Sequence, residues 1–509
     1  MLWSAYMVAP MAAFPNNFLR PTSLSSDLTS LLSPTIIMRT RLLSCLLLLL
    51  ATSGLFAQNE HPNILILIGD DIDRDTLGPW GGAARTPHLD RLAKEGMRLD
   101  AVYANVAMCA PFRQELYSGR AAWRTRAMPN HSKSVEGTKS LPHYLEPLGY
   151  RVGLLGKTHI GPKDAYPFDY LGDVSKKEDG NPQLVKRATK YITQARDAGK
   201  PFCLVVASHD GHGPYTTGDP SQYDAATLPL EKDKIDTPAY RREFQQHLAE
   251  VTNLDALLGD LRAVLKQEEL ADNTLVIFCS EQGNAFPFAK WTCFNDGLAS
   301  GVVVAMPSKI PAGSSSKQLT WIADIAPTLL EAAGGEASAE DFDGKSQWQN
   351  WTGADQPVHD YAYGAFTNCN IIDNRDRVFP IRSIRDTQYT LLWSPRAEKT
   401  ITSNTTLTQA LQWIQTPDMN GKANPAASWV RKALRTESPE AIELMHRLHN
   451  RPEWALYDRQ ADAEELNNLI DDPQHAAKVE ELKEALNAWL SRWDDADPVA
   501  TERGFVKQR

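Results

Sequence analysis

Uninterrupted apolar runs that end in small or polar residues constrain the fold of this chain more than any other feature. The first run, residues 63–69, reads NILILIG and leads directly into acidic residues. A run of this kind is typical of a strand that is buried on both faces of a parallel sheet. Comparable runs occur at residues 152–156, 202–208, 274–280 and 301–306.

Between and after these runs, apolar residues follow a helical spacing at residues 87–96, 244–265 and 320–334. Strands that alternate with helices predict an α/β fold, in which helices cover both faces of one sheet. In such sheets a ligand binds beyond the carboxyl ends of the strands. The residues that directly follow each apolar run are therefore candidates for a functional site.

The pattern changes in the last third of the chain. Residues 376–393 show shorter alternating strands, and residues 478–493 have the apolar spacing of an amphipathic helix. We therefore expect a catalytic α/β domain over residues 58–375 and a smaller C-terminal α+β subdomain over residues 376–509.

The N-terminus has the layout of a secretory signal peptide. Met38 is followed by Arg39, Arg41 and a short apolar run at residues 42–51, and small residues come next. The run is too short to span a membrane comfortably, and a buried helix is the alternative. We expect translation to begin at Met38 and residues 1–57 to be a leader plus signal peptide. The mature chain would then be periplasmic or secreted, without a membrane span.

Composition and charge narrow the class of protein. The chain is 42% hydrophobic and 23% charged, as globular proteins are. Its 53 Lys and Arg residues against 63 Asp and Glu residues give a net charge of −10, which argues against a nucleic-acid partner but leaves room for a local basic pocket. Of its six cysteines, Cys45 lies in the leader, and the others are too few for a disulfide scaffold.

Two pairs of residues with carboxylate or amide side chains follow apolar runs directly. Asp70 and Asp71 come after the first run, and Glu281 and Gln282 come after residues 274–280. Neighbouring carboxylates repel each other unless a positive charge lies between them. A divalent cation with oxygen ligands, Ca²⁺ before Mg²⁺, would account for both pairs, whereas acidic loop residues or helix caps are the alternative.

Cys109 stands four residues before Arg113 and at the start of a helix-like stretch. A cation and a helix N-terminus both stabilise an anionic group, so this position suits a reactive side chain. The alternative interpretation is a buried structural cysteine.

The motif around Cys109 resembles a known family signature. CAPFR at residues 109–113 is similar to the C-x-P-x-R signature of the type I sulfatases, and SGR at residues 118–120 fits its S/T-G-R extension. The resemblance implies an alkaline-phosphatase-like α/β/α sandwich and an enzyme that hydrolyses sulfate esters or sulfamates of carbohydrates. Further similar segments occur in the family's order at residues 70–71, 86–90, 156–159, 208–214, 281–282, 290–292, 454–458 and 465–469.

The resemblance also implies a modified nucleophile and a metal. In that family the signature cysteine is oxidised by a formylglycine-generating enzyme, and the hydrated aldehyde is the nucleophile. Cys109 would then be formylglycine in the mature protein. By similarity Ca²⁺ would be surrounded by Asp70, Asp71, Glu281, Gln282 and the modified Cys109.

The same resemblance assigns roles to further residues. Arg113, Lys157 and Lys290 would neutralise the charge on the sulfuryl oxygens. His159 matches the residue that takes a proton from the second hydroxyl of the hydrated aldehyde when bound sulfate is expelled. His212, together with Lys290, matches the group that protonates the departing oxygen or nitrogen.

Three residues depart from the family pattern. Glu281 and Gln282 stand where the family usually has Asp followed by Asn or His, so this carboxylate reaches one methylene further. Phe112 replaces a small residue, which bears on recognition by the formylglycine-generating enzyme. In the C-terminal part, an arginine within residues 381–385 is expected at the surface, paired with Asp386, with a substrate contact as the alternative.

The substrate class rests on less specific segments. Residues 156–162 and 379–383 are similar to the sulfamidase (N-sulfoglucosamine sulfohydrolase) branch. An O-sulfatase on another sulfated polysaccharide is the alternative. A phosphodiesterase on the same fold would carry Ser or Thr at position 109, and a non-catalytic glycan-binding relative would lack some of Cys109, Arg113 or Lys157.

Overall fold

The structure is a computed structural model that describes residues 61–174, 180–234, 236, 238–369, 378–399 and 439–507. The predicted leader and signal peptide, with the start at Met38, lie outside these residues. So do residues 376 and 377, at the start of the predicted C-terminal strands. Within the described ranges, no helix combines the length and the apolar character needed to cross a membrane.

The apolar runs form the centre of an eight-stranded sheet with the order β5-β4-β6-β1-β7-β8-β2-β9. Four of the predicted strands are parallel neighbours: β4 (Arg151–Gly156), β6 (Phe202–Ala207), β1 (Asn63–Ile68) and β7 (Thr274–Cys279). The fifth, β8 (Val302–Ala305), pairs with β7 in the antiparallel direction. The outer strands are β5 (Asp169–Tyr170), β2 (Met97–Leu99) and β9 (Ser314–Ser316).

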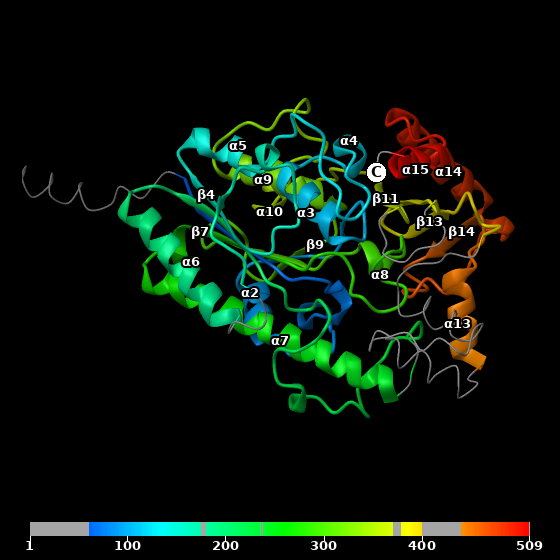
Figure 1. Ribbon diagram of the computed structural model, residues 1–509, viewed down its shortest axis with the longest axis horizontal. Helices are drawn as coiled ribbons and strands as arrows, with labels where there is room; N and C mark the ends of the chain where they lie inside the picture. The colour runs from blue at the N-terminus through cyan, green and yellow to red at the C-terminus, as the bar shows by residue number, and fades with distance from the viewer. Residues whose placement is uncertain are drawn as a thin grey trace, which may run out of the picture. The chain divides into compact units, whose positions relative to one another are not determined.

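Successive side chains of β1 point to opposite faces of the sheet and enter two separate hydrophobic cores. Leu65 and Leu67 belong to one core, and Ile64, Ile66 and Ile68 belong to the other. The first core is covered by α2 (Pro87–Glu95), α6 (Gly180–Asp197) and α7 (Pro238–Gln267) (Figure 1). The second is covered by α3 (Cys109–Ser118), α5 (Leu141–Leu145) and α9 (Ile325–Ala332). The predicted α/β architecture, with helices on both faces, is confirmed.

The helix expected over residues 320–334 is shorter than predicted. The first residues of this range instead form strand β10 (Thr320–Trp321) and a 3₁₀ turn (Ile322–Asp324). Only α9 is α-helical within the range. The reason is a side-chain cap, because Asp324 accepts a hydrogen bond from the backbone amide of Trp321 at 2.9 Å. The helix expected over residues 244–265 is present and forms the larger part of α7, which extends beyond it at both ends.

A smaller antiparallel sheet follows in the order β11-β12-β13-β14. Its strands are β11 (Ala362–Phe366), β12 (Ile381–Arg385), β13 (Tyr389–Trp393) and β14 (Trp454–Asp458). The predicted amphipathic helix is α14 (Ala476–Arg492), which packs against β12 and β13. Strand β11 precedes residue 375, and the domain boundary placed there stays a prediction.

The arginines of β12 are buried, so the expected surface arginine paired with Asp386 is wrong. Arg382 forms a two-pronged ion pair with Asp495 at 2.5 and 3.0 Å. Arg385 donates to the carbonyl oxygen of Cys293 at 2.7 Å. Both side chains are fully buried, because β12 is an inner strand and both of its faces are covered. Residues 382 and 385 point to opposite faces, and the guanidinium of Arg385 lies 4.8 Å from the ring centroid of Tyr103.

Candidate active site

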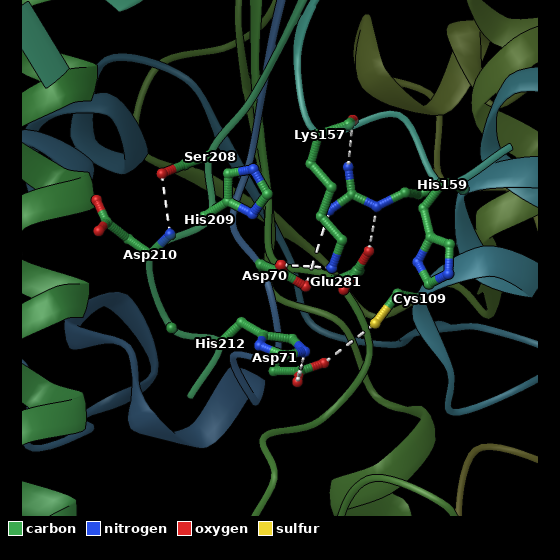
Figure 2. Close-up of polar contacts among 12 residues, drawn as sticks. Asp70, Asp71, Cys109, Lys157, His159, Ser208, His209, Asp210, His212 and Glu281 are labelled. Carbon is green, nitrogen blue, oxygen red and sulfur yellow. Dashed lines mark hydrogen bonds and ion pairs between the residues drawn. The ribbon is translucent and has the colours of Figure 1, made fainter. Parts of the chain in front are cut away.

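Four central strands end at the same level, which brings together the residues that follow them. Ile68 of β1 is in register with Ala207 of β6 and with Cys279 of β7. Ala207 is in turn in register with Gly156 of β4. The side chains that Figure 2 shows converging there are Asp70 and Asp71 after β1, Lys157 and His159 after β4, His212 after β6, and Glu281 after β7.

The backbone at this edge has conformations that residues other than glycine rarely adopt. Asp71 and His159 have φ angles of 56° and 53°, in the left-handed region. Such conformations cost about 1–3 kcal/mol each and cluster at functional sites. Gly156 has a φ of 90°, and a Cβ atom there would lie 2.1 Å from the carbonyl oxygen of Ala207. Glycine is therefore required where β4 turns toward Lys157.

Cys109 is the first residue of α3 and is buried. Its Sγ atom lies 3.3 Å from Lys290 Nζ, 3.5 Å from Asp71 Oδ1 and 3.8 Å from Gln282 Nε2. Burial, together with the charges of Asp71 and Glu281, raises the pKa of the Cys109 thiol well above its ordinary value. Because only the thiolate is strongly nucleophilic, the unmodified side chain is inert at neutral pH.

Carboxylates and cations alternate around Cys109. Three buried ion pairs each measure 2.5 Å between the charged atoms: Lys157 with Asp70, Lys290 with Asp71, and Arg113 with Glu281. Burial alone would raise the pKa of Asp70, but Lys157 and Arg113 outweigh it and hold that pKa well below its ordinary value. Burial raises the pKa of Glu281 to about 8, although Arg113 opposes the shift, so the cations of the described site match or outnumber its carboxylate charges at neutral pH.

Several oxygens in this cluster are suited to a metal ion. Asp70 Oδ1, Glu281 Oε2 and Gln282 Oε1 are buried and accept no hydrogen bond from any described residue. Asp70, Asp71, Cys109 and Glu281 each place one possible ligand atom within 4.8 Å of the others. Buried oxygens without donors are costly unless a cation binds them, and Ca²⁺ prefers such ligands. The residues present therefore fit a divalent cation.

A second acidic cluster, formed by Glu231, Asp233 and Asp296, has a different character. The ammonium nitrogen of Lys234 lies 3.0, 2.7 and 2.6 Å from these three carboxylates in turn. Lys234 thus occupies the position that a metal ion would take and offsets one of the three negative charges, while burial raises the pKa values of Glu231 and Asp233 to about 7.

The two histidines expected at the site lie there, in different surroundings. His212 Nε2 is 3.6 Å from Asp71 Oδ2, and its Nδ1 is 2.7 Å from the carbonyl oxygen of Gly213. His159 Nε2 is 2.6 Å from Nδ1 of His131. Burial, Lys157 and His131 lower the pKa of His159 to about 3, so its imidazole is neutral at pH 7.

All residues predicted for the site are thus brought together, and their individual roles stay predictions. His131 was missed because it lies in a loop without a recognisable pattern, and only the fold places it beside His159. No sequence signal of the kind used above would have found it.

Comparisons with known proteins agree with this geometry. A family profile described as Sulfatase matches residues 62–335. An ulvan-active sulfatase of Formosa agariphila is 30% identical over 464 residues, which cover 88% of this chain and 85% of that protein. The human N-sulphoglucosamine sulphohydrolase is 24% identical over 491 residues, covering 88% of this chain and 93% of the relative.

Solved structures share the fold. A sulfatase structure from Bacteroides fragilis superimposes with a TM-score of 0.67 at 20% identity, covering 88% of this chain and 99% of that one. A protein solved with its substrate D-glucosamine-2-N,6-O-disulfate gives a TM-score of 0.63 at 18% identity, with coverage of 86% and 99%. These neighbours have the alkaline-phosphatase-like fold, which confirms the predicted architecture.

Proposed function

Since the chain belongs to the sulfatase family and is a sulfuric ester hydrolase, we propose that it removes sulfate groups from a sulfated polysaccharide. The observation that carries this proposal is the position of Cys109, whose Sγ lies 3.3 Å from Lys290 Nζ among three buried ion pairs. A sulfate ester is an anion that gains charge on its leaving atom as it reacts, and fixed cations stabilise that charge.

Cys109 is the precursor of the nucleophile in this proposal. A formylglycine-generating enzyme would oxidise it to formylglycine, whose hydrated aldehyde supplies a hydroxyl nucleophile in place of an inert thiol. The C-x-P-x-R arrangement of Cys109, Pro111 and Arg113 supports this maturation. Burial of the thiol and its raised pKa support it too, because they leave the unmodified side chain without a reactive form.

The metal in this proposal is Ca²⁺, held by Asp70, Asp71, Glu281, Gln282 and the modified Cys109. When bound, it supplies positive charge that attracts a sulfate oxygen and favours ionisation of a neighbouring hydroxyl. The buried oxygens that lack hydrogen-bond donors support this assignment. Because the cations of the site already match or outnumber its carboxylate charges, a divalent cation would make the site net positive and suited to an anionic group.

Three cations bind and orient the sulfate group. Arg113, Lys157 and Lys290 are all largely enclosed, with side-chain exposures of 0%, 13% and 4%. Charges act more strongly there than in water, because the surroundings screen them less. Lys290 bridges Asp71 and position 109, so it also fixes the position of the reacting side chain.

The two histidines move protons. His159, neutral at pH 7, accepts a proton near position 109. His212 carries a hydrogen on Nδ1 that it donates to the Gly213 carbonyl oxygen at 2.7 Å. Its Nε2 therefore faces the site and, when protonated, donates to the departing oxygen or nitrogen.

The proposed setting is outside the cytoplasm. The signal peptide that begins at Met38 and ends near residue 57 would direct the chain to the periplasm or out of the cell and would be removed. In the mature chain, residues 58–375 would form the catalytic domain and residues 376–509 the smaller subdomain.

The substrate is proposed to be a polysaccharide carrying O-linked sulfate. The support is the ulvan-active relative, which is 30% identical over most of both chains. A second candidate is a sulfamate of glucosamine, supported by the human N-sulphoglucosamine sulphohydrolase at 24% identity and by the similar segment at residues 156–162.

Sulfate release separates these candidates. The protein is co-expressed with a formylglycine-generating enzyme, and the mass of the peptide carrying position 109 reports conversion to the aldehyde. It is then assayed on ulvan, on N-sulfoglucosamine oligosaccharides and on matched O-sulfated, N-acetylated ones, with Cys109→Ala as the blank. Release from the O-sulfated substrates supports the first candidate, and release from only the N-sulfated set replaces it by the second. A fully converted protein that releases sulfate from none of them contradicts the proposal.

A further inference from the structure

His131 connects the half-buried His159 to solvent. Its Nδ1 lies 2.6 Å from Nε2 of His159, and the two ring centroids are 4.6 Å apart. His131 is exposed, whereas Nδ1 of His159 is buried and makes no hydrogen bond to any described residue. Both residues have left-handed backbone, with φ angles of 59° and 53°. Such a conformation is rare for residues other than glycine and brings the two rings together at a cost.

The contact restricts which nitrogen of His159 carries hydrogen. When both rings are neutral, a single hydrogen lies between Nε2 of His159 and Nδ1 of His131. If His159 donates it, Nδ1 of His159 keeps a lone pair and can accept a proton. If His131 donates it, Nδ1 of His159 already carries a hydrogen and cannot act as a base. Only the first arrangement agrees with the role assigned to His159 above. It puts hydrogen on Nε2 of His131, which lies 3.3 Å from the side-chain amide of Asn130, so the oxygen of that amide must take the nearer position and accept this hydrogen.

We propose that His131 is a positioning residue that holds His159 in the tautomer with hydrogen on Nε2 and passes its proton to solvent. This inference rests on the proposed function. A proton arrives at Nδ1 of His159, and the hydrogen on Nε2 moves to Nδ1 of His131. The hydrogen on Nε2 of His131 then leaves to water, so both rings return to neutrality with their hydrogens exchanged between the nitrogens. The starting arrangement is restored when Nδ1 of His159 loses its hydrogen to water in the open site, the hydrogen on Nδ1 of His131 returns to Nε2 of His159, and Nε2 of His131 takes up a proton from solvent.

Three variants test the proposal through different properties of the ring. His131→Ala removes both the acceptor and the relay, and we expect kcat to fall roughly 10–100-fold with little change in KM, as for other residues that orient a functional histidine. Imidazole added to the buffer should restore part of that kcat. His131→Gln keeps an oxygen that accepts from Nε2 of His159 but cannot relay, so it should retain the tautomer and gain nothing from imidazole. His475→Ala, which removes a histidine paired with Asp472 away from the site, is the matched control.

A spectroscopic readout is independent of activity. In protein labelled with ¹⁵N-histidine, ring-nitrogen chemical shifts show which nitrogen carries hydrogen, and the signals of His159 are those lost in His159→Gln. We expect hydrogen on Nε2 in the wild type and in His131→Gln, and a mixture of tautomers in His131→Ala.

Two results would overturn the inference. One is hydrogen on Nδ1 of His159 in the wild type. The other is an unchanged kcat in His131→Ala, or a loss of kcat that imidazole does not restore and that accompanies a lower melting temperature. Failure of the proposed function is distinguishable, because the wild type itself would then release no sulfate, while the tautomer measurement would still give its answer.

Discussion

The ammonium nitrogen of Lys290 lies 3.3 Å from the sulfur of Cys109, and the same nitrogen lies 2.5 Å from Asp71 Oδ2. Lys290 therefore contacts both the residue proposed to become the nucleophile and a residue proposed to hold the metal. One side chain joins the two parts of the site.

Lys290→Met should lower kcat/KM roughly 10²–10³-fold, because it removes a fixed cation from the place where charge develops. The substitution keeps most of the volume of the side chain. Steady-state sulfate release measures the effect, with Lys139→Met, which changes a half-exposed lysine paired with Asp341, as the control. An unchanged kcat/KM for Lys290→Met would contradict the role assigned to this cation.

Removal of calcium should lower both activity and stability. An ion that binds only the folded state stabilises it by about 2.7 kcal/mol when its free concentration is 100 times Kd. Melting curves in a chelator and in excess Ca²⁺ should therefore differ, and Ca²⁺ should restore sulfate release. In Asp70→Asn, which weakens the ligand set, the calcium-dependent shift should shrink. Identical melting curves for the wild type under both conditions would argue against a metal at this site.

Glu115 should make stability depend on pH. It is buried in α3, accepts a hydrogen bond from the Asn105 amide at 2.9 Å, and burial raises its pKa from 4.5 to about 8. The folded state then keeps a proton that the unfolded chain releases, so this contribution to stability is complete below about pH 4.5 and is lost as the pH rises to about 8. Glu115→Gln should remove this loss.

Denaturant unfolding near pH 5 and near pH 8 measures this effect. The difference between wild type and Glu115→Gln should change with pH, and Glu340→Gln, at an exposed position, should leave the wild-type profile as it is. A constant difference between wild type and Glu115→Gln at the two pH values would disprove the assignment.

The buried pair of Arg382 and Asp495 should contribute strongly to stability. Asp495 accepts from Arg382 and also from the indole nitrogen of Trp123 at 2.7 Å. Asp495→Ala leaves a buried guanidinium without a counter-charge, which costs about 3–5 kcal/mol. The double variant Arg382→Met with Asp495→Leu should be less destabilised than Asp495→Ala alone, as measured by denaturant unfolding. A larger loss of unfolding free energy in the double variant would mean that the unpaired guanidinium is not the cause of the destabilisation in Asp495→Ala.

The central strands were predictable because each is a continuous apolar run with polar residues directly after it. The positions of Asp70, Lys157 and Glu281 follow from that pattern, since parallel strands end at one edge of a sheet. The direction of β8 did not follow from the pattern, because an apolar run reads the same in a parallel and in an antiparallel strand.

Other features depend on tertiary contacts that a linear pattern does not contain. Arginine is mostly a surface residue, yet Arg382 and Arg385 lie in β12, an inner strand, and the turn after α14 supplies Asp495. His131 belongs to a loop, and its contact with His159 exists only after β4 and the loop before it have come together. The length of α9, in contrast, depends on a local contact, the cap that Asp324 forms with the Trp321 amide.

Lys234 gives the second acidic cluster a permanent counter-charge, because its ammonium group is covalently part of the chain. In the proposed site the corresponding charge would come from an ion that can leave. The second acidic cluster thus has a fixed counter-charge, whereas the proposed site would have an exchangeable one. Only the cluster around Cys109 would respond to the calcium concentration of the surroundings, and the loops that meet at Lys234 would keep their arrangement when calcium is scarce.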